Sequence, residues 1–313
     1  MAASGTRVVF MGSPRFAVPS LRALHSAGYL LVAAVSQPDR PAGRGGHVHL
    51  PEVKQAALEL GIGTFQPASL RDAATVERLE AFGADVFVVA AYGKILPRAV
   101  LQLPKRGCVN VHGSLLPRWR GPSPIQAAIL AGDSETGVSI MELAPEMDAG
   151  PVLSKVPFPL GPAVTAGEVE EVLAALGAAE LTRVLPGWLS GEVKAVPQDE
   201  NLVTYCRLVS KADGHLAASM TAEQAERAVR AYNPWPTAFV LYKGDRLRIW
   251  RARLAPGDGE PGATKVIDRR PAIAFAGGWL VLEEVQRTGS RRVPGDQFLN
   301  GERGNLHPSV GLA

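Results

Sequence analysis

The first half of the chain alternates short apolar runs with segments whose apolar residues recur at helical spacing. The apolar runs cover residues 6–12, 30–37, 84–92 and 107–113, and the helical segments cover residues 19–28, 52–61 and 73–83. From Val86 to Ala91 the chain is apolar at every position, which is typical of a central strand buried on both faces. This alternation predicts an α/β fold, with a mostly parallel, Rossmann-like sheet covered by helices on both faces.

The pattern changes near residue 190. A polar, irregular stretch is followed by one helical segment over 221–232 and by short strand-like pieces separated by Gly, Pro and Asp. These pieces cover residues 237–242, 246–254, 263–270 and 272–286. They indicate a small all-β barrel or sandwich. We therefore predict a first domain over 1–189, a linker over 190–206 and a second domain over 207–313.

Composition excludes several protein classes. Hydrophobic residues make up 46% and charged residues 20% of the 313 residues, which is typical of soluble globular proteins. No uninterrupted apolar run reaches the roughly 18 residues of a membrane span. The start, MAASGTRVVFMG, resembles neither a signal peptide nor a transit peptide. Two cysteines, Cys108 and Cys206, do not make a disulfide framework, so we expect a cytoplasmic protein.

The net charge of +3 is unevenly distributed. Residues 205–313 carry 16 Lys and Arg against 11 Asp and Glu, whereas residues 1–204 carry 17 against 19. The excess in the last third fits either a well-solvated surface or a surface that meets a polyanion. Charge alone leaves both readings open.

Two polar residues end the apolar run 107–113, in the stretch NVHGSLLPRWRG. Asn110 and His112 lie two apart on a predicted strand, so they project to the same face. Ligands of open α/β sheets bind beyond the carboxyl ends of the strands. An amide donor beside an imidazole suits a carbonyl that becomes an oxyanion. The alternative is that both side chains satisfy nearby backbone groups.

Two further stretches interrupt the pattern of strands and helices. Asp148, in ELAPEMDAGPVL, either forms an Asx-turn or orients His112 and accepts a proton. Residues 37–49 carry Arg40 and Arg44 in a connection longer than usual, which is either flexible or able to grip phosphates. The first turn has too few glycines for a dinucleotide fingerprint, and the His and Cys spacings do not form a metal site.

Six motifs, in order from residue 8 to about residue 239, together resemble one family. They are VVFMGSPRFAVPSL, QPDRPAGRG, AYGKILP, NVHGSLLPRWRGPSPIQ, MDAGPV and NPWPTAF. They are similar to the methionyl-tRNA formyltransferases, a branch of the 10-formyltetrahydrofolate-dependent formyltransferases. The resemblance implies a transferase that moves a formyl group from 10-formyltetrahydrofolate to the α-amine of methionine on initiator methionyl-tRNA, for translation initiation.

The resemblance also assigns residues. It implies that Asn110, His112 and Asp148 are catalytic. The implied folate contacts are Ala91, Tyr92, Gly93, Ile95, Leu96, Ser114, Leu115, Leu116 and Pro117. The expected tRNA contacts are Arg40, Arg44, Arg118, Arg120, Arg207 and Lys211. Residues 207–313 are then an OB-like barrel that helps to hold tRNA, and we expect a monomer that needs no metal and no membrane.

Other functions remain possible at this stage. The acceptor could be a sugar nucleotide or a small amine, or water could replace it in a 10-formyltetrahydrofolate hydrolase. A non-catalytic RNA-binding protein is a further alternative. The QPDRPAGRG loop and the basic last third favour tRNA. The chain departs from the family pattern at His47 and His49, and at Leu216-Ala217-Ala218.

Overall fold

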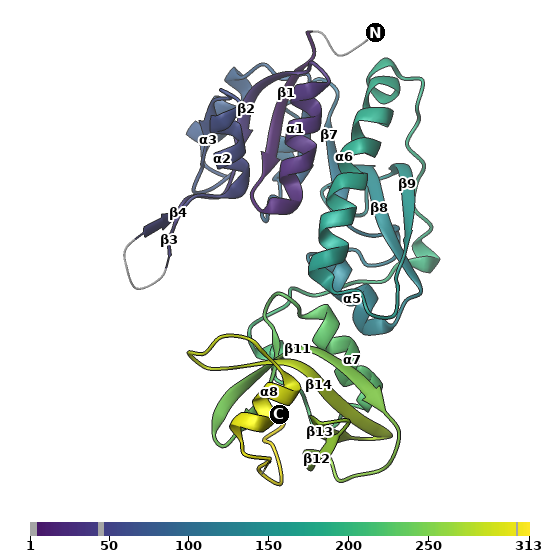
Figure 1. Cartoon of the computed structure of the whole chain (residues 1–313). Coiled ribbons are helices and arrows are strands. Elements are labelled where there is room, and N and C mark those ends of the chain that lie inside the picture. Colours follow the sequence, from purple (N-terminus) through teal and green to yellow (C-terminus); the bar gives the residue numbers. More distant parts are fainter. Residues whose placement is uncertain (1–4, 43–46, 305) are drawn as a thin grey trace. The chain divides into compact units, whose positions relative to one another are not determined.

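The chain forms two compact units (Figure 1). The computed structural model describes residues 5–42, 47–304 and 306–313. The first unit consists of Met1–Pro124, Glu135–Pro159 and Glu170–Cys206, and the second of Ile125–Ser134, Leu160–Val169 and Arg207–Ala313.

The first unit is built on a seven-stranded sheet of order β5-β2-β1-β6-β7-β8-β9. Its strands are β1 (Arg7–Gly12), β2 (Leu30–Val35), β5 (Thr64–Phe65), β6 (Val86–Ala90), β7 (Cys108–His112), β8 (Glu135–Glu142) and β9 (Val152–Pro159). The first five in this order are mutually parallel, and β8 is antiparallel to both β7 and β9. The prediction of a mostly parallel α/β sheet is confirmed. The strand order reverses at β1, which lies between β2 and β6.

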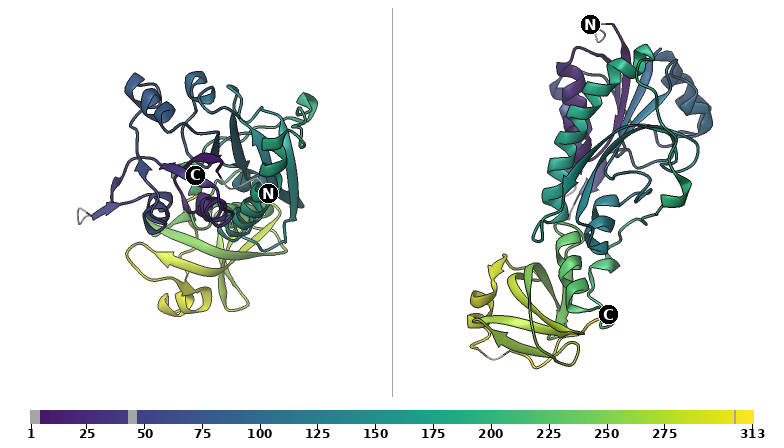
Figure 2. Two further views of the ribbon diagram at one scale, coloured as in Figure 1. Left: turned by 90° about the horizontal axis from the view of Figure 1, so that it is seen from above. Right: turned by 90° about the vertical axis from the view of Figure 1, so that its right-hand side faces the viewer.

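Helices cover both faces of this sheet. They are α1 (Val18–Ser26), α2 (Glu52–Glu59), α3 (Ala73–Ala81), α4 (Arg98–Leu101) and α6 (Ala166–Ser190), with a short 3-10 helix η1 (Arg15–Ala17) before α1. Odd-numbered residues of β1 and β6 form one cluster with Leu79 of α3 and Val100 of α4. The even-numbered residues of both strands are equally buried on the other face. Figure 2, right, shows α1 and α6 on that other side of the sheet.

The helix α6 lies very close to the sheet. A Cβ atom on Gly177 would come within 2.6 Å of Val111 and 3.3 Å of Val138, so glycine permits this approach. By length and apolar composition α6 also passes the test for a membrane-spanning helix, although half of its apolar window is buried inside the protein. A buried core helix satisfies the same criteria.

The second unit is an antiparallel β structure with α-helices and a short 3-10 helix, η3 (Ala212–Gly214). Its strands are β10 (Ala238–Tyr242), β11 (Asp245–Ala255), β12 (Thr264–Ile267), β13 (Arg270–Phe275), β14 (Gly278–Arg287) and β15 (Val293–Pro294); its helices are α5 (Pro124–Ala131), α7 (Ala222–Ala231) and α8 (Gly295–Gly301). The order is β10-β11-β14-β13-β12, with β15 beside β14. Single bridges join residue 311 to β10 and residue 309 to Ala263, but no ladder closes the sheet. The OB-like barrel is therefore not confirmed.

Two local features stabilise this unit. The helix α7 begins with a capping box, in which Thr221 and Gln224 exchange hydrogen bonds with each other's backbone N–H. Leu216 is the first residue of the triplet 216–218, which departs from the family's sequence pattern. It is fully buried, and its N–H donates to the Phe239 carbonyl at 3.0 Å. Its own carbonyl accepts the N–H of Ala313 at 2.9 Å. The triplet therefore anchors the C-terminal residues within the second unit.

Candidate active site

Asn110 and His112 lie side by side on one face of β7, as the strand period requires. Both are nearly buried, with 8% and 6% of their surface exposed. Within residues 5–42, 47–304 and 306–313, the side-chain amide of Asn110 makes no hydrogen bond, and it is not among the fully buried polar groups that lack a partner. The amide therefore keeps contact with solvent and can donate to a ligand.

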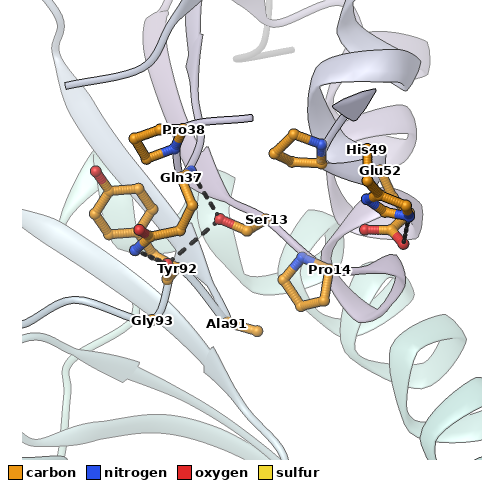
Figure 3. A pocket seen from close by; sticks show the side chains of 10 residues that line it. Ser13, Pro14, Gln37, Pro38, His49, Glu52, Ala91, Tyr92 and Gly93 are labelled. Carbon is orange, nitrogen blue, oxygen red and sulfur yellow. Dashed lines mark hydrogen bonds and ion pairs between the residues drawn. The ribbon is translucent and has the colours of Figure 1, made fainter. Parts of the chain in front are cut away.

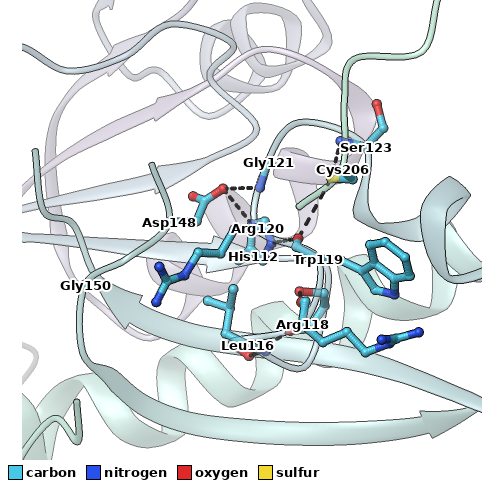
Figure 4. A network of polar contacts seen from close by, with 12 residues as sticks. His112, Leu116, Arg118, Trp119, Arg120, Gly121, Ser123, Asp148, Gly150 and Cys206 are labelled. Carbon is cyan, nitrogen blue, oxygen red and sulfur yellow. Dashed lines mark hydrogen bonds and ion pairs between the residues drawn. The ribbon is translucent and has the colours of Figure 1, made fainter. Parts of the chain in front are cut away.

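Asp148 reaches His112 from the loop between β8 and β9. Because β8 is antiparallel to β7, this loop begins beside the start of β7, where Leu143 N–H donates to the Cys108 carbonyl. The loop returns over the sheet, and the Asp148 carboxylate oxygen Oδ2 lies 3.7 Å from His112 Nδ1 (Figure 4). The same oxygen accepts the backbone N–H of Gly121 at 2.8 Å. The three residues predicted to be catalytic thus come from one strand and one loop that folds back onto it.

The second nitrogen of His112 also faces an acceptor. Its Nε2 lies 3.0 Å from the Trp119 carbonyl oxygen, which can only accept, so Nε2 carries the hydrogen. Nδ1 faces the Asp148 carboxylate. A protonated imidazole can donate to both acceptors at once, and this suits a group that holds a proton during a reaction.

Three site residues have left-handed backbones although they are not glycines: Ala91, Trp119 and Asp148, with φ of 44°, 61° and 48°. Such conformations each cost on the order of 1 kcal/mol or more and cluster at functional sites. Ala91 follows β6, Trp119 carries the carbonyl that His112 contacts, and Asp148 carries the carboxylate. These three strained positions therefore lie in loops near the predicted catalytic residues, whereas the other non-glycine residues with positive φ that the structure describes lie in the second unit.

The turn that follows His112 is held by serine hydroxyls. Ser114 Oγ donates to the Arg118 carbonyl at 2.6 Å, and Ser139 Oγ donates to the Ser114 carbonyl at 2.7 Å. Ser139 Oγ also accepts the Leu116 N–H at 3.0 Å. Ser114 and Leu116 are fully buried. Their side chains build the turn, whereas the partly exposed Leu115 and Pro117 are the accessible members of this group.

The two arginines beside Trp119 have different surroundings. Arg118 is exposed, and its guanidinium lies 4.4 Å from the centre of the Trp119 ring. Arg120 is only 2% exposed, and its guanidinium pairs with Glu200 at 2.7 Å and lowers the pKa of that carboxyl. Arg120 therefore faces the protein interior, contrary to the prediction of a solvent-facing tRNA contact. Of the two expected tRNA contacts in this stretch, Arg118 alone is exposed.

Two features require glycine at position 121: its positive φ and the close packing around its Cα atom. Its φ is 119°, and a Cβ atom would lie 2.3 Å from the Cys206 carbonyl oxygen. We expect Gly121→Ala to lower the free energy of unfolding by about 2–4 kcal/mol, from overpacking and backbone strain together. Gly107→Ala is the matched control, since Gly107 also has positive φ, 79°, but nothing within 4 Å of its Cβ position. Urea unfolding of both variants checks this, and equal losses would contradict the packing argument.

A separate cavity of about 360 Å³ lies at the carboxyl ends of β1, β2 and β6, where the strand order reverses (Figure 3). It is lined by Ser13, Pro14, Gln37, Pro38, His49, Pro51, Glu52, Ala91, Tyr92 and Gly93. Gln37 joins two of its walls, because its N–H donates to Ser13 Oγ and its side chain donates to the Tyr92 carbonyl, both at 3.0 Å. The catalytic residues are not among its lining residues.

The cavity brings together two motifs that are distant in the sequence. Three of the predicted folate contacts, Ala91, Tyr92 and Gly93, line it together with the root of the arginine-bearing loop. The loop itself contains a hairpin of β3 (Arg40–Ala42) and β4 (His47–His49). Asp39, just before the hairpin, is held by Lys54 Nζ at 2.6 Å and by the Gln66 amide at 2.7 Å, and both contacts lower its pKa.

The remaining predicted contacts fall in different surroundings. Ile95 is 72% exposed, whereas Leu96 is buried in the core cluster. Arg40 lies in β3, and Arg44 lies outside the described residues. Arg207 is exposed but pairs with Asp213, and Lys211 is exposed.

The pairing of Arg207 gives the second unit a pH-dependent contribution to stability. Arg207 and the N–H and hydroxyl of Ser210 donate to the Asp213 carboxylate and hold its pKa well below its ordinary value of 3.8. A lowered pKa stabilises the folded state above the unfolded pKa, and the contribution is lost as the pH falls through the folded one. We expect Asp213→Asn to cost about 1–2 kcal/mol at pH 7 and less as the pH falls below about 4. Urea unfolding at pH 7 and pH 3 measures this, and a pH-independent cost would contradict it.

Sequence reasoning missed two residues of the site, Gly121 and Met147. Gly121 supplies the N–H that Asp148 accepts, and Met147 is an apolar neighbour of Asp148 that is 51% exposed. Neither has a local sequence signal, because their roles depend on a contact between loops. Over the described ranges, no group of three or more His, Cys, Asp or Glu residues is arranged to hold a metal ion.

Comparison with known proteins identifies the family. A family model described as formyl transferase matches residues 6–185, and one described as formyl transferase, C-terminal domain, matches residues 208–303. The chain belongs to the formyl transferase family. The family's N-terminal model thus covers all three residues that we predicted to be catalytic.

Members of this family with similar sequences carry a single name. A protein of Methylococcus capsulatus named methionyl-tRNA formyltransferase is 46% identical over 297 residues, covering 94% of this chain and 96% of the relative. One of the same name from Aromatoleum aromaticum is 45% identical over 302 residues, covering 96% of both chains. The similarity therefore extends over both units.

Solved structures with the same fold are more distant in sequence. A sugar 3N-formyltransferase, WlaRD, has a TM-score of 0.66 at 14% identity and covers 91% of this chain and 99% of its own. HypX from Aquifex aeolicus, in complex with tetrahydrofolic acid, has a TM-score of 0.61 at 19% identity, over 95% of this chain and 48% of its own. At such identities these matches establish the fold alone.

Proposed function

We propose that this protein transfers the formyl group of 10-formyltetrahydrofolate to the α-amine of methionine on initiator methionyl-tRNA. One structural observation supports this most directly: His112 lies between the Asp148 carboxylate and the Trp119 carbonyl, beside the unpartnered amide of Asn110. The names of relatives that are 42–46% identical over nearly the whole chain support the same reaction. Such a reaction belongs in the cytoplasm, where initiator tRNA is used.

The first step is attack of the amine nitrogen on the formyl carbon. An α-amine has a pKa of about 8, and esterification lowers it, so a useful fraction is neutral at physiological pH. As the new C–N bond forms, the carbonyl oxygen becomes an oxyanion. The Asn110 amide donates to that oxygen. The Nδ1–H of the protonated His112 ring can also donate to it, because at 3.7 Å from Asp148 this N–H is not held by a hydrogen bond, whereas Nε2–H stays on the Trp119 carbonyl. Each donor acts mainly in the transition state.

The second step moves a proton and expels the folate nitrogen. The amine proton passes to the Asp148 carboxylate, directly or through water, and the protonated His112 ring gives a proton to N10 of the folate as its bond to the formyl carbon breaks. Asp148 then returns the proton to His112. The 3.7 Å between His112 Nδ1 and Asp148 Oδ2 is short enough for an ion pair and long enough for the carboxylate to accept another donor. No proton is gained or lost overall.

The folate contacts need a flat, apolar surface beside the catalytic residues. Ile95 and Met147 present exposed apolar side chains on the two loops that follow β6 and β8. The unpartnered Asn110 amide supplies a polar contact. These groups fit a formyl-substituted folate, and we propose Ile95, Leu115 and Pro117, with Ala91 to Gly93, as its contacts.

The tRNA contacts are proposed for two surfaces. The hairpin β3–β4 carries Arg40, and its root is fixed by Lys54 and Gln66. In the second unit, Arg246 and Arg248 lie two apart on β11, so they project from the same face of the strand. A row of cations suits a phosphate backbone. We keep Arg118, Arg207 and Lys211 in this set, together with Arg44, and leave out the buried Arg120.

Two rival acceptors share this chemistry. WlaRD, which has this fold, formylates a sugar amine, and a hydrolase would use water instead. Incubation with 10-formyltetrahydrofolate labelled in the formyl group separates them, with initiator tRNA, elongator tRNA and no tRNA in parallel. We expect label on initiator methionyl-tRNA. Formate release without tRNA would indicate a hydrolase, and label on neither product would refute formyl transfer to tRNA.

A further inference from the structure

Gln198 joins the loop that carries Asp148 to the loop that follows β7, although it belongs to the irregular stretch after α6. Its Nε2 donates two hydrogen bonds, to the Asp148 carbonyl at 2.8 Å and to the Gly150 carbonyl at 2.7 Å. Its Oε1 accepts the Nε–H of Arg120 at 3.0 Å. The other two nitrogens of the Arg120 guanidinium donate to Glu200.

Arg120, which donates to Gln198, is itself held rigidly. The Arg120 guanidinium is 2% exposed and pairs with both carboxylate oxygens of Glu200, at 2.7 and 3.3 Å. The Arg120 backbone is also paired with residues 204 and 206, because its N–H donates to the Thr204 carbonyl and its carbonyl accepts the Cys206 N–H. A planar, buried guanidinium held in this way is a fixed donor, so it fixes the position of the Gln198 Oε1 that accepts from it.

Asp148 needs such support, because its backbone is left-handed and, among the residues that the structure describes, one backbone N–H, that of Gly121, orients its carboxylate (Figure 4). Gly121 directly follows Arg120, so one rigid segment supplies both the N–H on the carboxylate and, through Gln198, the two donors on the loop carbonyls. We propose that Gln198 is a positioning residue, which holds the Asp148 loop at the distance from His112 that proton transfer requires.

This inference rests on the formyl transfer proposed above, and on Gln198 acting only through Asp148. A shift of about 1 Å in a catalytic group costs roughly 10²-fold in rate. Gln198→Leu is therefore expected to lower kcat about 10–100-fold with little change in the KM for 10-formyltetrahydrofolate. Gln102→Leu, at an exposed position of the same unit, is the matched control and should behave as the wild type.

Gln198→Glu distinguishes the contact of Gln198 with Arg120 from its two contacts with the loop that carries Asp148. It keeps the size and the acceptor that Arg120 needs, but it replaces the Nε2 donor by an oxygen that faces two carbonyls. If Gln198 served only to satisfy Arg120, Gln198→Glu would retain wild-type kcat. If it positions Asp148, Gln198→Glu is as slow as Gln198→Leu.

The Asp148→Asn background supplies the decisive readout. Single-turnover labelling at high enzyme concentration measures the slow rates of this variant with and without Gln198→Leu. We expect Gln198→Leu to cost less than about twofold there, since it acts through a carboxylate that is no longer present. An unchanged kcat for Gln198→Leu, wild-type activity of Gln198→Glu, or an undiminished cost in the Asp148→Asn background would each overturn the proposal. Failure of the wild-type enzyme to label tRNA would instead refute the proposed function.

Discussion

Replacing His112 by alanine is expected to lower kcat for formyl transfer by about 10²–10⁴-fold, the usual contribution of a positioned acid or base. The reason is the position of its ring between two acceptors, the Asp148 carboxylate and the Trp119 carbonyl. Without the ring, the oxyanion loses a donor and the departing folate nitrogen loses its source of a proton. Rates of label transfer at saturating folate and tRNA give kcat directly.

Folding and catalysis must be separated in this experiment, because His112 is nearly buried and its Nε2 donates to a carbonyl. His112→Asn keeps a donor for that carbonyl but cannot hold a proton at neutral pH. We expect it to be as slow as His112→Ala and closer to the wild type in thermal stability. His25→Ala, at an exposed position of α1, controls for the loss of a histidine as such. Near-normal kcat for His112→Asn would exclude the ring from proton transfer.

Much of the first unit could be predicted because its signals are local. The apolar runs of β1, β6 and β7 and the helical periodicity of α1 to α3 are short-range patterns, and so is the two-residue spacing that places Asn110 and His112 on one face. The strand β9 (Val152–Pro159) was missed. It contains Pro157 and Pro159 and lies at the edge of the sheet, the position where proline is tolerated but where it also obscures a strand pattern.

The errors in the second unit and in the site have other physical causes. Residues 272–286 were predicted as one strand-like piece, but β13 and β14 are separated by a turn at Gly277, whose φ is 77°. Arg120 was predicted to contact tRNA, but its guanidinium is buried and pairs with Glu200, which lies 80 residues away in the sequence. Long-range ion pairs of this kind leave no periodic signal.

The convergence of Asp148 on His112 is the feature that sequence periodicity could not have supplied. It depends on an antiparallel β8, a left-handed turn and a carboxylate held by Gly121. From the residues alone, a link between Asp148 and His112 is one of two alternatives, and the resemblance to the formyltransferases favours it. Sequence spacing predicts which helix or strand carries a residue, whereas contacts between loops decide which residues meet.

Asn110→Ala is expected to lower kcat by about 10²–10³-fold, or about 2.7–4 kcal/mol, as for the loss of one oxyanion donor. Its amide has no hydrogen-bond partner anywhere in the part of the chain that the structure describes, so its removal leaves no protein group unsatisfied. The melting temperature should therefore shift by no more than about 2 °C, so unfolding of the variant would not explain the loss of kcat. Asn300→Ala, at an exposed position of α8, serves as the control.

Asn110→Asp makes the assignment sharper, because it keeps the shape of the side chain. A carboxylate removes the N–H donor and places a negative charge where the oxyanion develops, so it should be slower than Asn110→Ala. The KM for the folate should change little in either variant, since the lost interaction belongs to the transition state. The expected order of kcat is therefore Asn, then Ala, then Asp. If Asn110→Ala retained near-normal kcat, the oxyanion would have to be held by His112 and a donor outside β7.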